Sequence, residues 1–67
     1  MIEVNGKPAQ LGSGSSVTAV LEWMRLDINA RGVAVAVDGE VVPRSDWDTF
    51  RLRDSARVEV LGAMQGG

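Results

Sequence analysis

The sequence predicts an α+β fold in which a mixed sheet of four to five strands packs against one main helix. Two turn signatures, Asn5-Gly6 and Asp38-Gly39, each lie between short segments with apolar side chains, as in β-hairpins. Between these hairpins, apolar side chains recur at helical spacing over residues 17–28. A single helix after a hairpin has to cross the sheet and cover one of its faces. Such a crossover allows the first strand and a late strand to pair in parallel at the centre.

The first hairpin is predicted from residues 1–11. Ile2 and Val4 alternate with a glutamate, which is typical of a half-buried strand. The return segment, 7–11, contains Pro8. Because proline has no backbone N–H to donate, this second strand is expected at an edge of the sheet.

The helix is predicted to begin after a Gly/Ser run, with Ser16 as its N-cap. Its core-facing stripe consists of Val17, Val20, Leu21, Met24 and Ile28. The helix is expected to end between Leu26 and Ala30, before Gly32. Trp23 falls beside this stripe, and the pattern leaves open whether it is a half-exposed boundary residue or a contact site.

Three further strands are predicted, over 33–37, 40–42 and 57–61. The first has valines on one face and alanines on the other, and its lack of polar residues predicts either burial on both sides or coverage by a neighbour. Pro43 stops the second strand. Residues 45–47 are expected to form one 3₁₀ turn with Ser45 as its cap, and Trp47 is expected to be a packing residue.

Composition excludes several classes of function. Cysteine, histidine and tyrosine are absent from the 67 residues, so the chain lacks the usual nucleophiles, general bases and zinc ligands. We therefore expect neither an enzyme nor a metal site. A formal charge of −2 disfavours nucleic acid as a partner, and the longest apolar run is too short to cross a bilayer. We expect a cytoplasmic protein.

The predicted order of elements is the ββαββ pattern of a β-grasp domain. Residues 35–47 read VAVDGEVVPRSDW and resemble the ThiS family, the ubiquitin-like sulfur carriers of thiamin biosynthesis. The family pattern runs Ala-Val-Ala-Val-Asn-Gly-Glu-Val-Val-Pro-Arg, then two variable residues and Trp. This chain departs from it at Asp38, a change that a turn tolerates. It also has Ser55-Ala56 where the family has Gly-Asp. The resemblance implies a ubiquitin-like β-grasp domain over 1–61 and a flexible tail over 62–67 that ends in Gly-Gly.

The resemblance also implies a chemical role for the tail. The Gly67 carboxylate is expected to be adenylated by a ThiF-like activating enzyme that uses ATP, and then converted by a persulfide sulfur donor to a thiocarboxylate. The sulfur would pass to a ThiG-like thiazole synthase. Gly66, Gln65 and Met64 are expected to thread into the partner's active site. The chain itself is expected to bind no cofactor and to be a monomer when free.

A docking surface beside the tail is predicted from strand parity. Leu61 shares a face with the polar residues of the last strand, opposite Val58 and Val60. Val42 would join Leu61 if their strands were adjacent. Arg44 is a further candidate contact, although a solvated or carboxylate-paired arginine and a lone exposed leucine are ordinary alternatives.

Other functions remain open from the sequence. The same fold serves sulfur transfer in molybdopterin synthesis and in cysteine or tRNA thiolation. It also serves ubiquitin-like modifiers that are joined to lysines, and plain binding modules in which the tail has no role.

Overall fold

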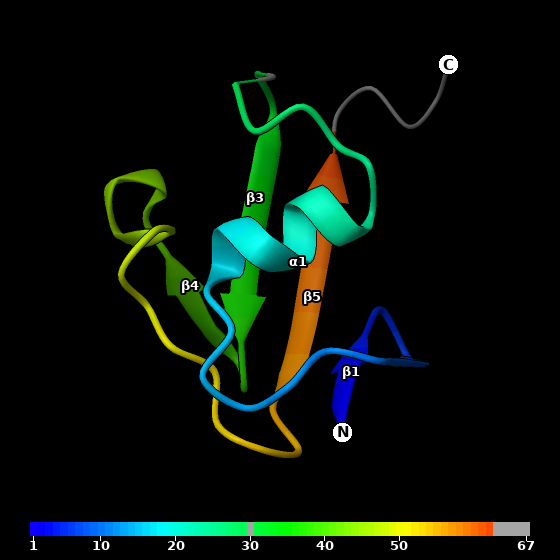
Figure 1. The fold of residues 1–67 in the computed structure, drawn as a ribbon. Helices are drawn as coiled ribbons and strands as arrows, with labels where there is room; N and C mark the ends of the chain where they lie inside the picture. The colour runs from blue at the N-terminus through cyan, green and yellow to red at the C-terminus, as the bar shows by residue number, and fades with distance from the viewer. Residues whose placement is uncertain (30, 63–67) are drawn as a thin grey trace.

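A mixed sheet carries one α-helix on one of its faces (Figure 1). The computed structural model describes residues 1–29 and 31–62. Within these residues the sheet has five strands in the order β2-β1-β5-β3-β4. The elements are β1 (Ile2–Val4), β2 (Lys7–Ala9), α1 (Val17–Trp23), β3 (Val33–Val37), β4 (Glu40–Val42), the 3₁₀ turn η1 (Arg44–Asp46) and β5 (Arg57–Gly62). This architecture confirms the predicted α+β class.

The centre of the sheet is built as the crossover requires. β5 lies between β1, with which it pairs in parallel, and β3, with which it pairs antiparallel. β2 is an edge strand, and its Pro8 lies opposite Glu3. The predicted edge position of Pro8 is therefore confirmed, because an edge strand leaves a row of backbone N–H groups unused.

Both predicted hairpin turns are present. Asn5 and Gly6 have φ angles of 50° and 81°, and Asp38 and Gly39 have φ angles of 51° and 88°. A two-residue turn with positive φ at both positions matches the twist of the strands that it joins. Asparagine and aspartate tolerate this conformation better than most residues, and glycine accepts it without strain.

Helix α1 begins where the sequence predicts and ends earlier. The Ser16 hydroxyl accepts a hydrogen bond from the backbone N–H of Ala19 at 3.1 Å, as an N-cap does. The predicted end between Leu26 and Ala30 is wrong, because the helix stops at Trp23. Ile28, which was expected on the helical stripe, lies beyond the helix and packs against the core from the connector.

The early stop of α1 is a Schellman motif. Arg25 has a left-handed φ of 63°. Its N–H donates to the Glu22 carbonyl, and the Leu26 N–H donates to the Leu21 carbonyl, both at 2.9 Å. These two bonds satisfy carbonyls that the helix end leaves unpaired. Leu26 then packs against the core, so the turn brings an apolar side chain back to the sheet.

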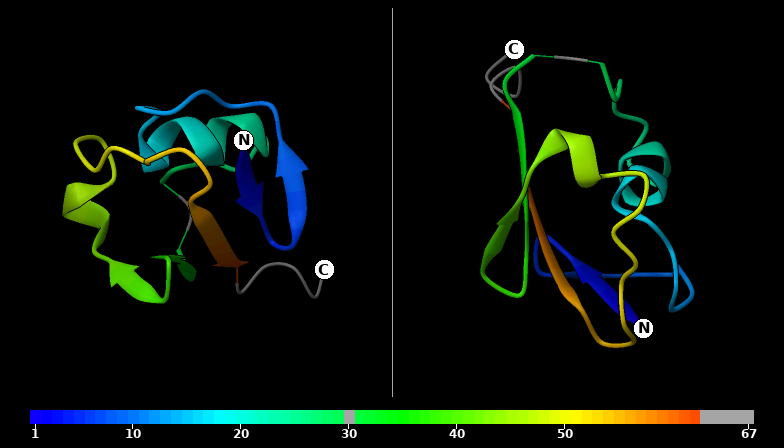
Figure 2. Two further views of the ribbon diagram at one scale, coloured as in Figure 1. Left: turned by 90° about the horizontal axis from the view of Figure 1, so that it is seen from below. Right: turned by 90° about the vertical axis from the view of Figure 1, so that its left-hand side faces the viewer.

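The core lies between α1 and one face of the sheet. It includes Val17, Val20 and Leu21 of the helix and Ile2, Val35 and Val58 of the sheet. The opposite face carries no helix among the described residues (Figure 2). Of the two predicted arrangements of β3, burial on both sides is therefore wrong, because Ala34 is exposed and Ala36 is half-buried, whereas Val35 and Val37 are buried.

The connector after β4 is joined to the core by Trp47. This side chain is only 4% exposed, and its Nε1–H donates to the Val42 carbonyl at 3.0 Å. The predicted packing role is confirmed. The predicted cap is wrong, because Pro43 occupies the N-cap position of η1 and no side chain caps that turn. Ser45 instead lies within η1.

Candidate functional site

The end of β5 is the site from which the tail departs. Gly62 is the last residue of the strand and pairs with Val33 of β3, one residue beyond the expected domain end at Leu61. The amino terminus lies at the opposite end of the sheet, because β1 and β5 run parallel (Figure 1). The predicted tail residues Met64, Gln65, Gly66 and Gly67 lie outside the described residues.

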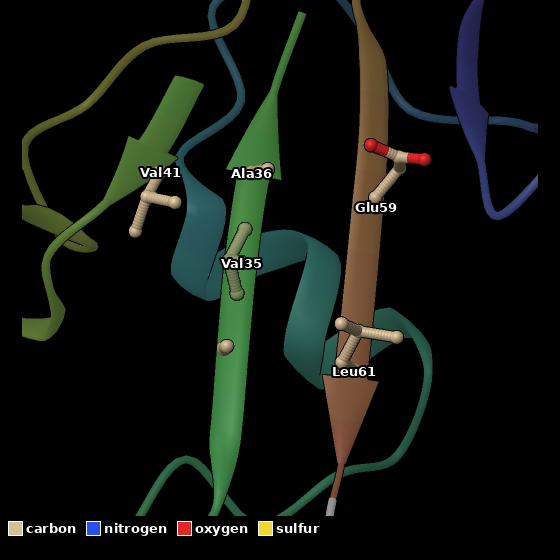
Figure 3. A pocket seen from close by; sticks show the side chains of 6 residues that line it. Val35, Ala36, Val41, Glu59 and Leu61 are labelled. Carbon is tan, nitrogen blue, oxygen red and sulfur yellow. The ribbon is translucent and has the colours of Figure 1, made fainter. Parts of the chain in front are cut away.

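The uncovered face of the sheet presents two large apolar side chains, of which Leu61 lies at this end and Val41 lies level with Ala36 and Glu59. Leu61 on β5 is 71% exposed and Val41 on β4 is 76% exposed. Ala34 and Ala36 of β3 lie between them and line a hollow of about 160 Å³. Figure 3 shows Val41 and Leu61 on either side of β3, with α1 behind the sheet. Glu59 of β5 also lines this hollow, so the surface is apolar with one carboxylate at its border and fits a partner that is mainly apolar.

This apolar face corrects one predicted contact and confirms the exposure of another. Leu61 is exposed, as its parity in β5 predicts. Val42 is only 4% exposed and packs into the core, so its expected place on the patch is wrong. Two facts account for this. β3 separates β4 from β5, and side chains alternate across a strand, so Val41 faces outward.

Val41 is the residue that the sequence reasoning missed. Its signal was present in the register of the second hairpin, because a turn at Asp38-Gly39 sets which residues of β4 lie opposite β3. That register pairs Val41 with Ala36, on the face away from the core.

Arg44 is engaged within the fold. Its guanidinium lies over the Trp47 ring, 4.4 Å from the ring centroid, and donates to the Ile28 carbonyl. Trp47 is a core residue and the Ile28 connector follows α1, so these contacts direct Arg44 away from Val41 and Leu61. The structure therefore does not bring Arg44 into the apolar patch.

Charged side chains border the apolar patch at the start of β5. Arg57 lies 3.7 Å from Glu3, and Arg53 lies 3.3 Å from Asp38. A hydrogen bond from the Met1 ammonium and its positive charge lower the pKa of the Asp54 carboxyl. All of these groups lie at the end of β5 away from Gly62. They offer no acid or base to chemistry at the tail.

Among residues 1–29 and 31–62, no group of three or more carboxylates can hold a metal ion. No helix in the same part of the chain is long and apolar enough to span a membrane.

Comparison with known proteins decides the family. The model of the ThiS family matches residues 2–67. The chain is 37% identical, over the full length of both proteins, to the sulfur carrier protein ThiS of Thermus thermophilus. It is 29% identical to the sulfur carrier protein ThiS of Escherichia coli, over 94% of this chain and 92% of that protein.

This chain belongs to the ThiS family. The crystal structure of the thiamine biosynthesis protein (ThiS) from Geobacter metallireducens superimposes with a TM-score of 0.76 at 34% identity. That match covers 98% of this chain and 97% of the Geobacter chain. The expected ubiquitin-like β-grasp fold is thereby confirmed, and the family is one of small sulfur carrier proteins.

Proposed function

We propose that this chain carries sulfur for the thiazole of thiamin as a thiocarboxylate on Gly67. The observation that carries the proposal is the ThiS family match, which extends through the tail to residue 67. The open end of β5 supports it, because the strand leads directly from the core into the tail. The proposal treats the free chain as a cytoplasmic monomer and a protein substrate of its partners.

The proposed reaction begins at the Gly67 carboxylate, which is a poor electrophile. A carboxylate oxygen attacks the α-phosphorus of ATP on a ThiF-like enzyme, pyrophosphate leaves, and an acyl adenylate forms. The terminal sulfur of a persulfide then attacks the acyl carbon and displaces AMP. A thiol reduces the resulting acyl disulfide and releases the thiocarboxylate, whose sulfur passes to a ThiG-like thiazole synthase.

The Gly66-Gly67 end suits this chemistry for steric reasons. An adenylate hydrolyses if water reaches it, so the activating site has to be narrow and dry. Glycine has no Cβ, so it passes a narrow channel and leaves the acyl carbon unhindered for a sulfur nucleophile. Residues 63–67 span at most about 17 Å when extended, which sets the depth that Gly67 reaches beyond Gly62. Met64 and Gln65 would line the same channel.

The apolar face beside Gly62 is the proposed docking surface for the activating enzyme. Ordering the tail costs about 1–2 kcal/mol per residue, and burial of Leu61 and Val41 against a partner can offset part of that cost. The proposed contact of this face with the activating enzyme thus supplies binding energy close to the end of β5, where the tail begins. Arg44 is not needed for it.

Intact mass tests the proposal. The chain is incubated with ATP, a ThiF-like enzyme and a persulfide donor, beside a control variant that lacks Gly67. A mass gain equal to the replacement of one oxygen by sulfur, absent from the control, is the expected result. An unchanged mass, with an enzyme proven active on its own carrier, would remove the thiamin assignment and leave another sulfur pathway or a plain binding module. An amide-linked adduct to a lysine would identify a ubiquitin-like modifier.

A further inference from the structure

Asn5 carries a second set of contacts beyond its turn. Its backbone N–H donates to the Val58 carbonyl at 2.9 Å, which is the last main-chain bond from the β1 side to β5. Its side chain continues the ladder: Oδ1 accepts from the Val60 N–H at 2.8 Å, and Nδ2 donates to the Val60 carbonyl at 3.2 Å. A primary amide has one acceptor and a donor side by side, as a peptide group has. The Asn5 side chain therefore occupies the place of the strand residue that β1 lacks.

These contacts set where β5 is held on both edges. Up to Val60, β5 has a hydrogen-bonding partner on each edge. One edge pairs with β3, and the other pairs first with β1 and then with the Asn5 side chain. Leu61 and Gly62 are paired with β3, through Ala34 and Val33. Without the Asn5 amide, the last position held on both edges would move from Val60 back to Val58, about 7 Å along the strand.

The residue type at position 5 has to meet two demands at once. The backbone has a φ of 50°, which favours asparagine, aspartate and glycine. The side chain has to accept from an N–H and donate to a carbonyl at Val60. Glycine offers neither group, and an ionised aspartate offers no donor. Asparagine meets both demands.

We propose that Asn5 is a positioning residue that fixes the direction in which the tail leaves β5 relative to the docking face. This inference rests on the proposed function. Leu61 lies next to Val60, so the hydrogen bonds from Asn5 to Val60 hold Leu61 and the end of β5 in one geometry. A tail that leaves β5 in a defined direction brings Gly67 to the activating site more often than a tail that leaves from an end of β5 held on one edge only.

Asp38 supplies a matched control at the other end of β5. It has a φ of 51° and also precedes a glycine in a hairpin turn. Its N–H donates to the Arg57 carbonyl at 2.8 Å, and its Oδ1 accepts from the Arg57 N–H at 3.0 Å. Asn5→Gly and Asp38→Gly therefore each remove a side-chain clamp on β5 and keep a turn backbone that glycine accepts.

The test compares activation kinetics of the two variants with those of the wild-type chain. Pyrophosphate release by a ThiF-like enzyme is measured against carrier concentration. For Asn5→Gly, kcat is expected to fall about tenfold while KM for the carrier stays within about twofold, because docking is kept and only orientation is lost. For Asp38→Gly, kcat and KM are both expected to stay near the wild-type values, although its denaturation midpoint is expected to fall as much as that of Asn5→Gly.

Amide hydrogen exchange gives a second readout that needs no enzyme. Exchange at Val60 and Leu61 is expected to accelerate in Asn5→Gly and to remain unchanged in Asp38→Gly. If Asn5→Gly does not fold, Asn5→Asp replaces it, since it keeps the bond from the Val60 N–H and loses only the donor. An unchanged kcat, or an equal loss in both variants, would overturn the positioning role. If the wild-type chain is not activated at all, the proposed function fails, and exchange still decides whether Asn5 holds Val60.

Discussion

Trp47 joins the connector after β4 to the core through two kinds of contact. Its ring is buried with the apolar side chains under α1, and its Nε1–H reaches the Val42 carbonyl. The Arg44 guanidinium lies over the same ring, 4.4 Å from its centroid. Trp23, by comparison, is 45% exposed on α1 and has no such hydrogen bond within the described chain. The two tryptophans therefore differ in what they contribute to stability.

Trp47→Phe is expected to lower the free energy of unfolding by about 1–3 kcal/mol, because it removes a buried hydrogen bond and part of a buried ring. Trp23→Phe is the control and should stay within about 0.5 kcal/mol of wild type. Urea denaturation of the three proteins checks both values. Equal effects of the two substitutions would mean that Trp47 does not anchor the connector.

At the scale of elements, the end of α1 depends on a residue in an unfavourable conformation. Arg25 occupies the left-handed position of the Schellman motif that glycine usually fills. A non-glycine residue there costs about 1–2 kcal/mol, so the burial of Leu26 after the turn must outweigh this cost. The end of α1 is thus set by the burial of Leu26 after the turn, and not by the spacing of apolar residues along the helix.

Arg25→Gly is expected to raise the free energy of unfolding by about 0.5–1 kcal/mol, since relief of the left-handed strain exceeds the extra chain entropy of glycine. Glu22→Gly, inside the helix, should lower it by about 1 kcal/mol. Thermal denaturation by circular dichroism distinguishes the two. A destabilised Arg25→Gly variant would show that the arginine side chain matters more than its backbone conformation.

The two faces of β4 allow a second prediction at this scale. Val41 and Val42 are neighbours in sequence that lie on opposite faces. Val41→Glu is expected to change the free energy of unfolding by no more than about 1 kcal/mol and to weaken binding to a ThiF-like enzyme at least tenfold. Val42→Glu should cost about 3 kcal/mol or more, because it buries a carboxylate.

Denaturation together with titration calorimetry of the activating enzyme checks these two variants. Unimpaired binding of Val41→Glu would remove the uncovered sheet face from the proposed docking surface. Leu61→Glu provides an independent test on β5.

At the scale of the whole molecule, the core and the tail are separable. All of the buried apolar residues of the described chain lie between Ile2 and Val60, in one cluster under α1. The sheet ends at Gly62, and the proposed chemistry takes place at Gly67. The proposed docking surface and the proposed reactive residue are therefore encoded by different parts of the chain.

A chain shortened to end at Gly62 is expected to have a free energy of unfolding within about 0.5 kcal/mol of that of the full chain, because it keeps every buried core residue of the described chain. It should still bind a ThiF-like enzyme through Leu61 and Val41, with reduced affinity, and gain no sulfur. Urea denaturation and the intact-mass assay measure these properties. A large loss of stability would mean that residues 63–67 belong to the folded body.

Local features were predictable from the sequence wherever they depend only on the backbone preferences of a few neighbouring residues. The two glycine turns, the Ser16 cap and the edge position of Pro8 each follow from backbone chemistry within a few residues. The motif at residues 35–47 was sufficient for the family. The proposed site at Gly67 came from that resemblance, and it stays a prediction.

The sequence by itself determined the fold class, the hairpins, the start of the helix and the family, because each rests on local periodicity or on a contiguous motif. Only the tertiary structure decided that α1 stops at Trp23, that Val41 rather than Val42 joins Leu61, and that Asn5 clamps Val60. Each of these depends on strand order or on a contact between residues far apart in the chain. The spacing of apolar residues along one segment does not determine which strand will lie next to it in the folded sheet.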